Sequence, residues 1–181
     1  CLLVVRTLGE EQLGFYSLTV MTVSAGMSVT LAVTQVVYPR MTHMYGQTHD
    51  AAKVFRWSWR PTLLLGVAAP AALAAGWLLV GPVVRIVLPK YVPGIPAAQW
   101  SMVTLYALCF TPPMNIYNVI RKQVFYAVVI ACGAGAFLAS LPLLKLLGQD
   151  PLVPYSQAMA VGSWVFVLTG NLLALRLVRR G

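Results

Sequence analysis

The chain has very few charges, and acidic residues are the scarcest of all. Only 4 of its 181 residues are Asp or Glu, 13 are Lys or Arg, and charged residues make up 9% of the total. Soluble domains carry about 25% charged residues. A chain so poor in charge and 59% hydrophobic could not maintain a surface in water, so the composition excludes an ordinary soluble domain.

The acidic residues are also absent from every long apolar stretch of the sequence. They are Glu10, Glu11, Asp50 and Asp150. Carboxylates inside a membrane are the usual relays for protons or sodium, so any coupling carboxylate must lie outside these stretches. The sequence also lacks a metal-ligand cluster, a nucleophile beside a base, and a Gly-rich loop before a Lys. We therefore expect no enzyme activity, no metal and no cofactor.

Cysteine and histidine are too few to suggest a disulfide framework or a metal site. Cys1, Cys109 and Cys132 show no spacing pattern, and His43 and His49 have no ligand partners near them in the sequence. The opening segment 1–5 is apolar and does not begin with Met. It resembles the tail of an earlier helix, so we expect the sequence to be a fragment that lacks an N-terminal part.

Apolar stretches long enough to cross a bilayer fill most of the chain. A spanning helix needs about 20 mostly apolar residues. Five stretches meet this length: 13–37, 61–80, 100–120, 124–144 and 155–175. The sequence therefore predicts an all-α, polytopic integral membrane bundle of about five transmembrane helices, forming a single membrane domain over 1–181.

The basic residues are distributed unequally between the two sides of these spans. If the spans alternate in direction, nine basic residues fall on one side: Arg40, Lys53, Arg56, Arg60, Arg121, Lys122, Arg176, Arg179 and Arg180. Four fall on the other: Arg6, Arg85, Lys90 and Lys145. The positive-inside rule places the richer side, and with it the C-terminus, in the cytoplasm. The net charge of +9 then reflects contact with anionic head groups rather than with nucleic acid.

The longest predicted connection is the loop 39–60. Its second part, 51–60, interleaves aromatic residues with Lys53, Arg56 and Arg60 at helical spacing. One interpretation is a short interfacial helix with aromatic anchors. The other is that Arg56 and Arg60 face a cavity and bind a phosphate-bearing substrate.

Two adjacent prolines interrupt the third predicted span. Pro112 and Pro113 remove two backbone donors and clash with the preceding turn. A broken membrane helix is tolerated where protein or a water-filled cavity satisfies the freed carbonyls, and transporters place such breaks near substrate sites. The segment is therefore either a structural kink or a site at which Asn115 and Asn118 supply polar groups.

The first span carries polar residues on two opposite faces. Ser17, Ser24, Ser28 and Gln35 lie within about 40° of one another on a helix. Thr19, Thr22, Gly26 and Thr30 lie on roughly the opposite face. A polar stripe on a membrane helix lines either a wet cavity or a hydrogen-bonded seam between helices, so we expect one of the two faces to be a packing seam.

Small residues form stripes on two other spans. The fourth span has Ala127, Ala131, Gly135 and Ala139 in one row, and the second has Ala68, Ala72 and Gly76. Membrane helices pack closely through such residues. Both stripes therefore predict helix–helix contacts.

Four segments together resemble a known family. The run LGEEQLGFYSL at 8–18 resembles the "LG…LG-x-Y-S-L" start of a helix in polysaccharide flippases, and VVYPR at 36–40 resembles the end of that helix. The segment 88–99 is similar to the family's "LP-x-Y-x-x-G-I-x-A" loop, and 115–123 to a helix that meets a basic turn. In this order they resemble the C-terminal half of a flippase of the multidrug/oligosaccharidyl-lipid/polysaccharide exporter superfamily, of the O-antigen or exopolysaccharide type.

The resemblance implies a partial MATE-like fold and the flipping of an undecaprenyl-pyrophosphate-linked glycan, by alternating access, across the bacterial inner membrane. Expected partners are membrane lipids, the glycan lipid used in lipopolysaccharide or related polysaccharide synthesis, the missing N-terminal bundle, a polysaccharide polymerase and glycosyltransferases. The candidate residues of the substrate path are Arg40, Arg56, Arg60, Arg121, Lys122, Asn115, Ser24, Ser28 and Gln35, with the helix break at Pro112 and Pro113. The basic members lie at the cytoplasmic edge. The alternatives are a drug or metabolite exporter of the same superfamily and a non-transporting membrane scaffold in polysaccharide assembly.

Overall fold

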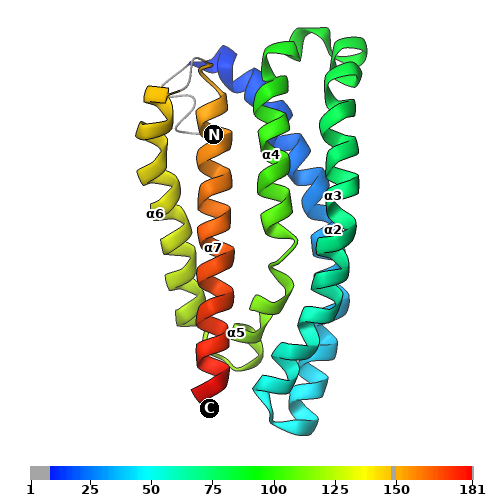
Figure 1. Cartoon of the computed structure of the whole chain (residues 1–181), viewed down its shortest axis with the longest axis vertical. Helices are drawn as coiled ribbons and strands as arrows, with labels where there is room; N and C mark the ends of the chain where they lie inside the picture. Colours follow the sequence, from blue (N-terminus) through cyan, green and yellow to red (C-terminus); the bar gives the residue numbers. More distant parts are fainter. Residues whose placement is uncertain (1–8, 148–149, 181) are drawn as a thin grey trace.

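The computed structural model describes residues 9–147 and 150–180, which are helical almost throughout and contain no strand. Four helices are long and apolar enough to cross a membrane (Figure 1). They are α2 (Glu10–Thr48), α3 (Ala51–Val87), α6 (Gln123–Leu147) and α7 (Val153–Arg180). The prediction of an all-helical fold is confirmed for the described residues, and the four long apolar helices agree with a membrane-embedded bundle.

The predicted count of about five spans is not confirmed, because the segment 100–120 is divided and contains no single helix long enough to span. It consists of the lower part of α4 (Ile95–Leu108), the 3-10 turn η2 (Pro112–Asn115) and the short helix α5 (Ile116–Val119). These pieces follow one another from one end of the bundle to the other (Figure 1). A second 3-10 turn, η1 (Pro89–Gly94), connects α3 to α4.

The segment 39–60 is not a loop, because helix continues through nearly all of it. The interpretation of 51–60 as a helix is confirmed, although this helix is the start of α3 rather than a short separate one. α2 continues past Pro39, α3 begins at Ala51, and only His49 and Asp50 separate the two helices. His49 adopts the left-handed conformation that ends α2, and the Asp50 carboxylate accepts a 2.9 Å hydrogen bond from the Lys53 backbone N–H at the start of α3. At 1.5 Å per residue the 39 residues of α2 measure about 58 Å. This exceeds the roughly 30 Å hydrocarbon layer, so polar residues occupy helix that projects beyond it.

Successive segments run in alternating directions, and a buried cluster marks each end of the bundle. One cluster joins the end of α2, the start of α3, α5, the start of α6 and the end of α7 through Met41, Phe55, Tyr117, Val129 and Val178. At the opposite end, Tyr16 of α2 packs with Ala97 of α4, Leu141 of α6 and Tyr155 of α7. The chain therefore traverses the bundle as the alternating topology requires (Figure 1).

The predicted seam on α6 is not found within the described residues, because Ala127, Ala131, Gly135 and Ala139 all lie on an exposed face of this helix. On α3, Ala68 and Ala72 are likewise exposed, whereas Gly76 is half-buried and lies against the Met102 side chain of α4.

The seam between α6 and α7 uses other glycines. A Cβ atom added to Gly133 would lie 2.8 Å from the Phe166 Cβ and 3.1 Å from the Gly162 carbonyl oxygen. Gly133 and Gly162 therefore bring the two backbones together. The stripe was misread because small size alone does not say which face of a helix meets its neighbour.

Candidate functional site

A cavity of about 390 Å³ lies where the broken segment meets α2, α6 and α7. It is lined by Met27, Thr30, Leu31, Thr34, Leu108, Thr111, Met114, Asn115, Asn118, Tyr126 and Phe166. Four residues of this lining come from α2, five from the end of α4 and the segment that follows it, and one each from α6 and α7. The helix break is therefore part of a cavity wall, rather than an isolated kink.

The two prolines create this wall by ending α4. The carbonyls that a continuous helix would satisfy at this point find other donors. The Leu108 carbonyl accepts hydrogen bonds from the backbone N–H and the hydroxyl of Thr111, at 3.2 and 2.8 Å. The Phe110 carbonyl accepts one from the Asn171 side-chain amide of α7, at 3.1 Å. Because an unsatisfied backbone group is costly in a membrane, Asn171 stabilises the break from outside the cavity.

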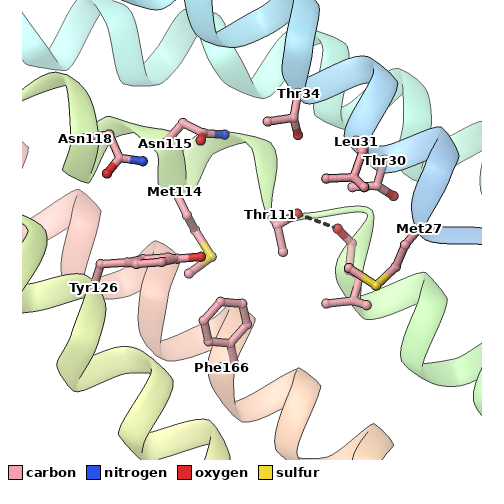
Figure 2. A pocket seen from close by; sticks show the side chains of 11 residues that line it. Met27, Thr30, Leu31, Thr34, Thr111, Met114, Asn115, Asn118, Tyr126 and Phe166 are labelled. Atoms are coloured by element: carbon pink, nitrogen blue, oxygen red, sulfur yellow. Dashed lines mark hydrogen bonds between the residues drawn. The ribbon is translucent and has the colours of Figure 1, made fainter. Parts of the chain in front are cut away.

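The polar groups of the cavity are uncharged, and three of them lie on one side of it. Figure 2 shows the amides of Asn115 and Asn118 and the hydroxyl of Thr34 on the side opposite the Phe166 ring. The Asn115 amide nitrogen donates to the Pro112 carbonyl at 2.9 Å, which leaves its oxygen as an acceptor. Such a wall can hydrogen-bond a neutral polar solute such as a sugar, while Phe166 and Tyr126 supply faces for its apolar side.

Asn115 lines this cavity, as does Asn118, which the sequence also placed at the break; the other predicted substrate-path residues do not line it. Thr34, Thr111, Tyr126 and Phe166 line it without having been predicted. A signal existed for Thr34, which lies one helical turn after Thr30. Tyr126 and Phe166 had none, because only the packing of α6 and α7 brings them to the break.

The serine stripe of α2 lies on the outside of the bundle. Ser24, Ser28 and Gln35 are all exposed, and the Ser28 hydroxyl donates to the Ser24 carbonyl at 3.1 Å. The opposite, threonine face is the packing seam. Thr19 and Thr30 are buried there, and Gly26 lies directly against the Leu105 side chain of α4. Of the two faces, the one that carries the predicted substrate-path residues is therefore exposed in the described part of the chain.

The predicted basic residues lie apart from the cavity, at one end of the bundle. We call this the basic end; its described side chains are Arg40, Lys53, Arg56, Arg60, Arg121, Lys122, Arg176 and Arg179, and all are exposed. It coincides with the buried cluster that contains Phe55 and Val178. Arg40, Arg121 and Lys122 line none of the cavities described here.

Two of the predicted arginines share a separate pocket at the basic end. Arg56 and Arg60 line a space of about 370 Å³ with Met44, Lys53 and Trp57. Among residues 9–147 and 150–180, no acidic side chain forms an ion pair with either arginine. The pocket therefore presents uncompensated positive charge, which suits an anion such as a phosphate.

Within the described part of the chain, no group of three or more His, Cys, Asp or Glu could hold a metal ion. Comparison with known proteins yields no match, whether to a family model, to a curated protein or to a solved structure.

Proposed function

We propose that this chain is the C-terminal bundle of a membrane transporter that flips a lipid-linked oligosaccharide across the bacterial inner membrane. The observation that carries the proposal is the cavity at the Pro112–Pro113 break, where uncharged hydrogen-bonding groups lie at the middle of an otherwise apolar bundle. A glycan requires such a path. Its lipid tail does not, because it can remain in the bilayer.

The separation of charge from the cavity agrees with a substrate made of two chemically different parts. The pocket of Arg56 and Arg60 suits a pyrophosphate, and the cavity of Thr34, Asn115 and Asn118 suits a neutral glycan. The exposed serine face of α2 would then pack against a companion bundle. The cavity would open and close as the two bundles move relative to each other. It also places the basic end and the C-terminus in the cytoplasm.

Export assays in a flippase-deficient strain test the cavity. We expect Asn115→Leu and Thr34→Val, in the full-length gene, to lower the rate of glycan export roughly 2–10-fold each, because each removes about one net hydrogen bond to an uncharged partner. Thr169→Val is the matched control. The Thr169 hydroxyl bonds only carbonyls of its own helix and lies outside the cavity. Unchanged export in both cavity variants, at equal protein levels, would contradict the proposed path.

The basic pocket has its own test in the same strain. We expect Arg56→Gln and Arg60→Gln to lower export about 10–100-fold, because hydrogen bonds to charged groups contribute about 1.5–3 kcal/mol each. Arg85→Gln, at the opposite end of the bundle, is the control and should have little effect. Unchanged export in both pocket variants would remove these arginines from the mechanism.

A second candidate function is export of a drug or metabolite. It is favoured by the apolar part of the cavity, where Met27, Met114, Tyr126 and Phe166 form an adaptable wall. Methionine-rich surfaces of this kind accept varied ligands. Deletion of the gene distinguishes the two functions, because this candidate predicts lost resistance to cationic dyes while glycan export continues.

A further inference from the structure

A second cavity lies on the outside of the bundle, between the first half of α3 and the second half of α7. Its volume is about 450 Å³. Phe55 and Trp59 of α3 form one wall, and Trp164 and Leu168 of α7 contribute to the other. The side chain of Leu168 is 54% exposed, so the cavity is a groove that opens sideways, toward the region that lipid occupies in a membrane. We call it the α3/α7 groove.

The surface of this groove is aromatic and almost wholly apolar. The Phe110 and Trp164 rings lie 6.3 Å apart within it, and the Phe55 and Trp59 rings meet edge-on at 6.3 Å. Asn171 is its polar lining residue, and the Asn171 amide donates to protein carbonyls. The groove therefore offers mainly apolar contact, and the indole N–H groups of Trp59 and Trp164 are the donors left to a ligand inside it.

The size of the groove suits a hydrocarbon chain. Its volume of about 450 Å³ falls in the range of roughly 300–1,000 Å³ that is typical of small-molecule sites, and a flexible acyl chain can lie along it.

Where the α3/α7 groove reaches the basic end of the bundle, a basic residue flanks it on each of the two helices. On α3, Arg56 directly follows the lining residue Phe55. On α7, Arg179 lies one helical turn beyond Leu175, which also lines the groove. Both arginines are exposed, and Phe55 shares a buried cluster with Val178, the neighbour of Arg179. No carboxylate of the described chain pairs with either arginine.

We propose that an anionic glycerophospholipid of the surrounding bilayer binds here, with one acyl chain in the α3/α7 groove and its phosphate at Arg56 and Arg179. Arg56 is shared with the proposed pyrophosphate pocket, whereas Arg179 and the groove are not, so Arg179→Gln and Leu172→Phe test the lipid site separately from transport. Charge complementarity at the mouth selects the lipid, and the apolar groove holds its chain.

A second lipid-facing groove provides an internal comparison. It lies between α3 and α4, has a volume of about 570 Å³, and is also apolar, with Trp77 and Tyr106 among its lining residues. No basic residue lies within one helical turn of its lining on either helix. We expect this groove to contact lipid without selecting for charge.

Quenching of tryptophan fluorescence by brominated lipids tests the proposal directly. One variant of the 181-residue chain keeps only Trp164, and a second keeps only Trp77; the other tryptophans become Phe in each. Both are reconstituted in phosphatidylcholine vesicles with increasing amounts of brominated phosphatidylglycerol or brominated phosphatidylcholine. We expect the anionic lipid to quench Trp164 at lower mole fractions than the neutral lipid and to saturate. For Trp77 the two lipids should quench alike and without saturation.

Charge and groove variants then separate the two parts of the site. In the Trp164-only chain, Arg56→Gln and Arg179→Gln should each raise the half-saturating fraction of anionic lipid roughly fivefold, whereas Arg85→Gln should not change it. Leu172→Phe, which narrows the groove, should weaken saturable quenching, and Leu78→Phe, on an exposed part of α3 outside it, should not.

Three results would overturn the inference. Equal, unsaturated quenching of Trp164 by both lipids would mean bulk contact only, and saturable quenching without charge preference would remove the role of the arginines. Protection of Trp164 from both lipids would mean that protein covers the groove. Native mass spectrometry of the unsubstituted chain provides a check that does not depend on the tryptophan variants. The unsubstituted chain should retain more bound phosphatidylglycerol than phosphatidylcholine in the spectrometer. The Arg56→Gln/Arg179→Gln double variant should lose this preference.

Discussion

Gly133 and Gly135 lie two residues apart on α6, and changing each to alanine should have opposite effects on stability. Gly135 is exposed and has no other group within 4 Å of an added Cβ atom. Gly133 is buried, and its added Cβ would meet the Phe166 Cβ at 2.8 Å and the Gly162 carbonyl oxygen at 3.1 Å. These obstacles are a backbone atom and the first atom of a side chain, so neither can rotate away.

The size of the difference follows from this geometry. Gly→Ala in a helix interior is favourable by about 0.5–1 kcal/mol, and this gain applies to both positions and cancels in the comparison. Forcing extra volume into a packed contact costs about 1–3 kcal/mol. We therefore expect Gly133→Ala to be less stable than Gly135→Ala by about 1–3 kcal/mol, with Gly135→Ala equal to or above the unsubstituted chain.

Reversible unfolding in mixed micelles, followed by helical circular dichroism, measures this difference. The same pair can be ranked by thermal unfolding in detergent, where the Gly133 variant should unfold at the lower temperature. Equal stabilities for the two variants would refute the reasoning, because they would mean that α6 and α7 do not approach through Gly133. A more stable Gly133→Ala than Gly135→Ala would point to a seam on the other glycine's face.

Further predictions concern the helix break and the topology. Asn171→Leu should lower the free energy of unfolding by about 1–3 kcal/mol, because it leaves the carbonyl freed by the break without its donor, whereas Thr169→Val should leave it nearly unchanged; chemical denaturation of both variants measures the difference. Tyr117→Phe removes a 2.6 Å hydrogen bond to the Gly170 carbonyl of α7 and should lower the free energy of unfolding by about 0.5–1.5 kcal/mol. Tyr126→Phe should lower it less in the same assay, because the Tyr126 hydroxyl has no hydrogen-bond partner in the described structure. Reporter fusions should be active in the cytoplasm when placed after the C-terminus and active outside it when placed in Pro89–Gly94; the reverse pattern would contradict the proposed orientation.

Composition alone was enough to predict the class of the fold. Charge-poor stretches of about 20 residues can only be buried in lipid or protein, and the structure places four long helices there. The exact ends of the helices were harder to predict from the sequence, because α2 and α3 continue beyond the apolar layer. The charged segment 51–60 has the spacing of a helix, but its charges hide the fact that this helix is continuous with the second span.

The candidate site was predictable only where the signal is local. Two adjacent prolines disrupt a helix in any surroundings. Asn115 follows Pro113 by two residues, so the break also predicts where Asn115 lies. Which face of α2 packs depends on its neighbour α4, through the contact between Gly26 and Leu105. The same limit applies to Phe166, which reaches the cavity only because α7 lies beside the break.

The hydrogen bond from Asn171 to Phe110 also has a consequence for how the protein is made. Its two residues are 61 positions apart in the chain, so at about 5–20 residues per second the ribosome needs about 3–12 s to synthesise the donor after the acceptor. During that interval the broken segment has no α7 beside it, and the Phe110 carbonyl needs another partner. We expect the segment to remain with the insertion machinery or in water until α7 arrives, which would make the insertion of α7 the step that completes the cavity.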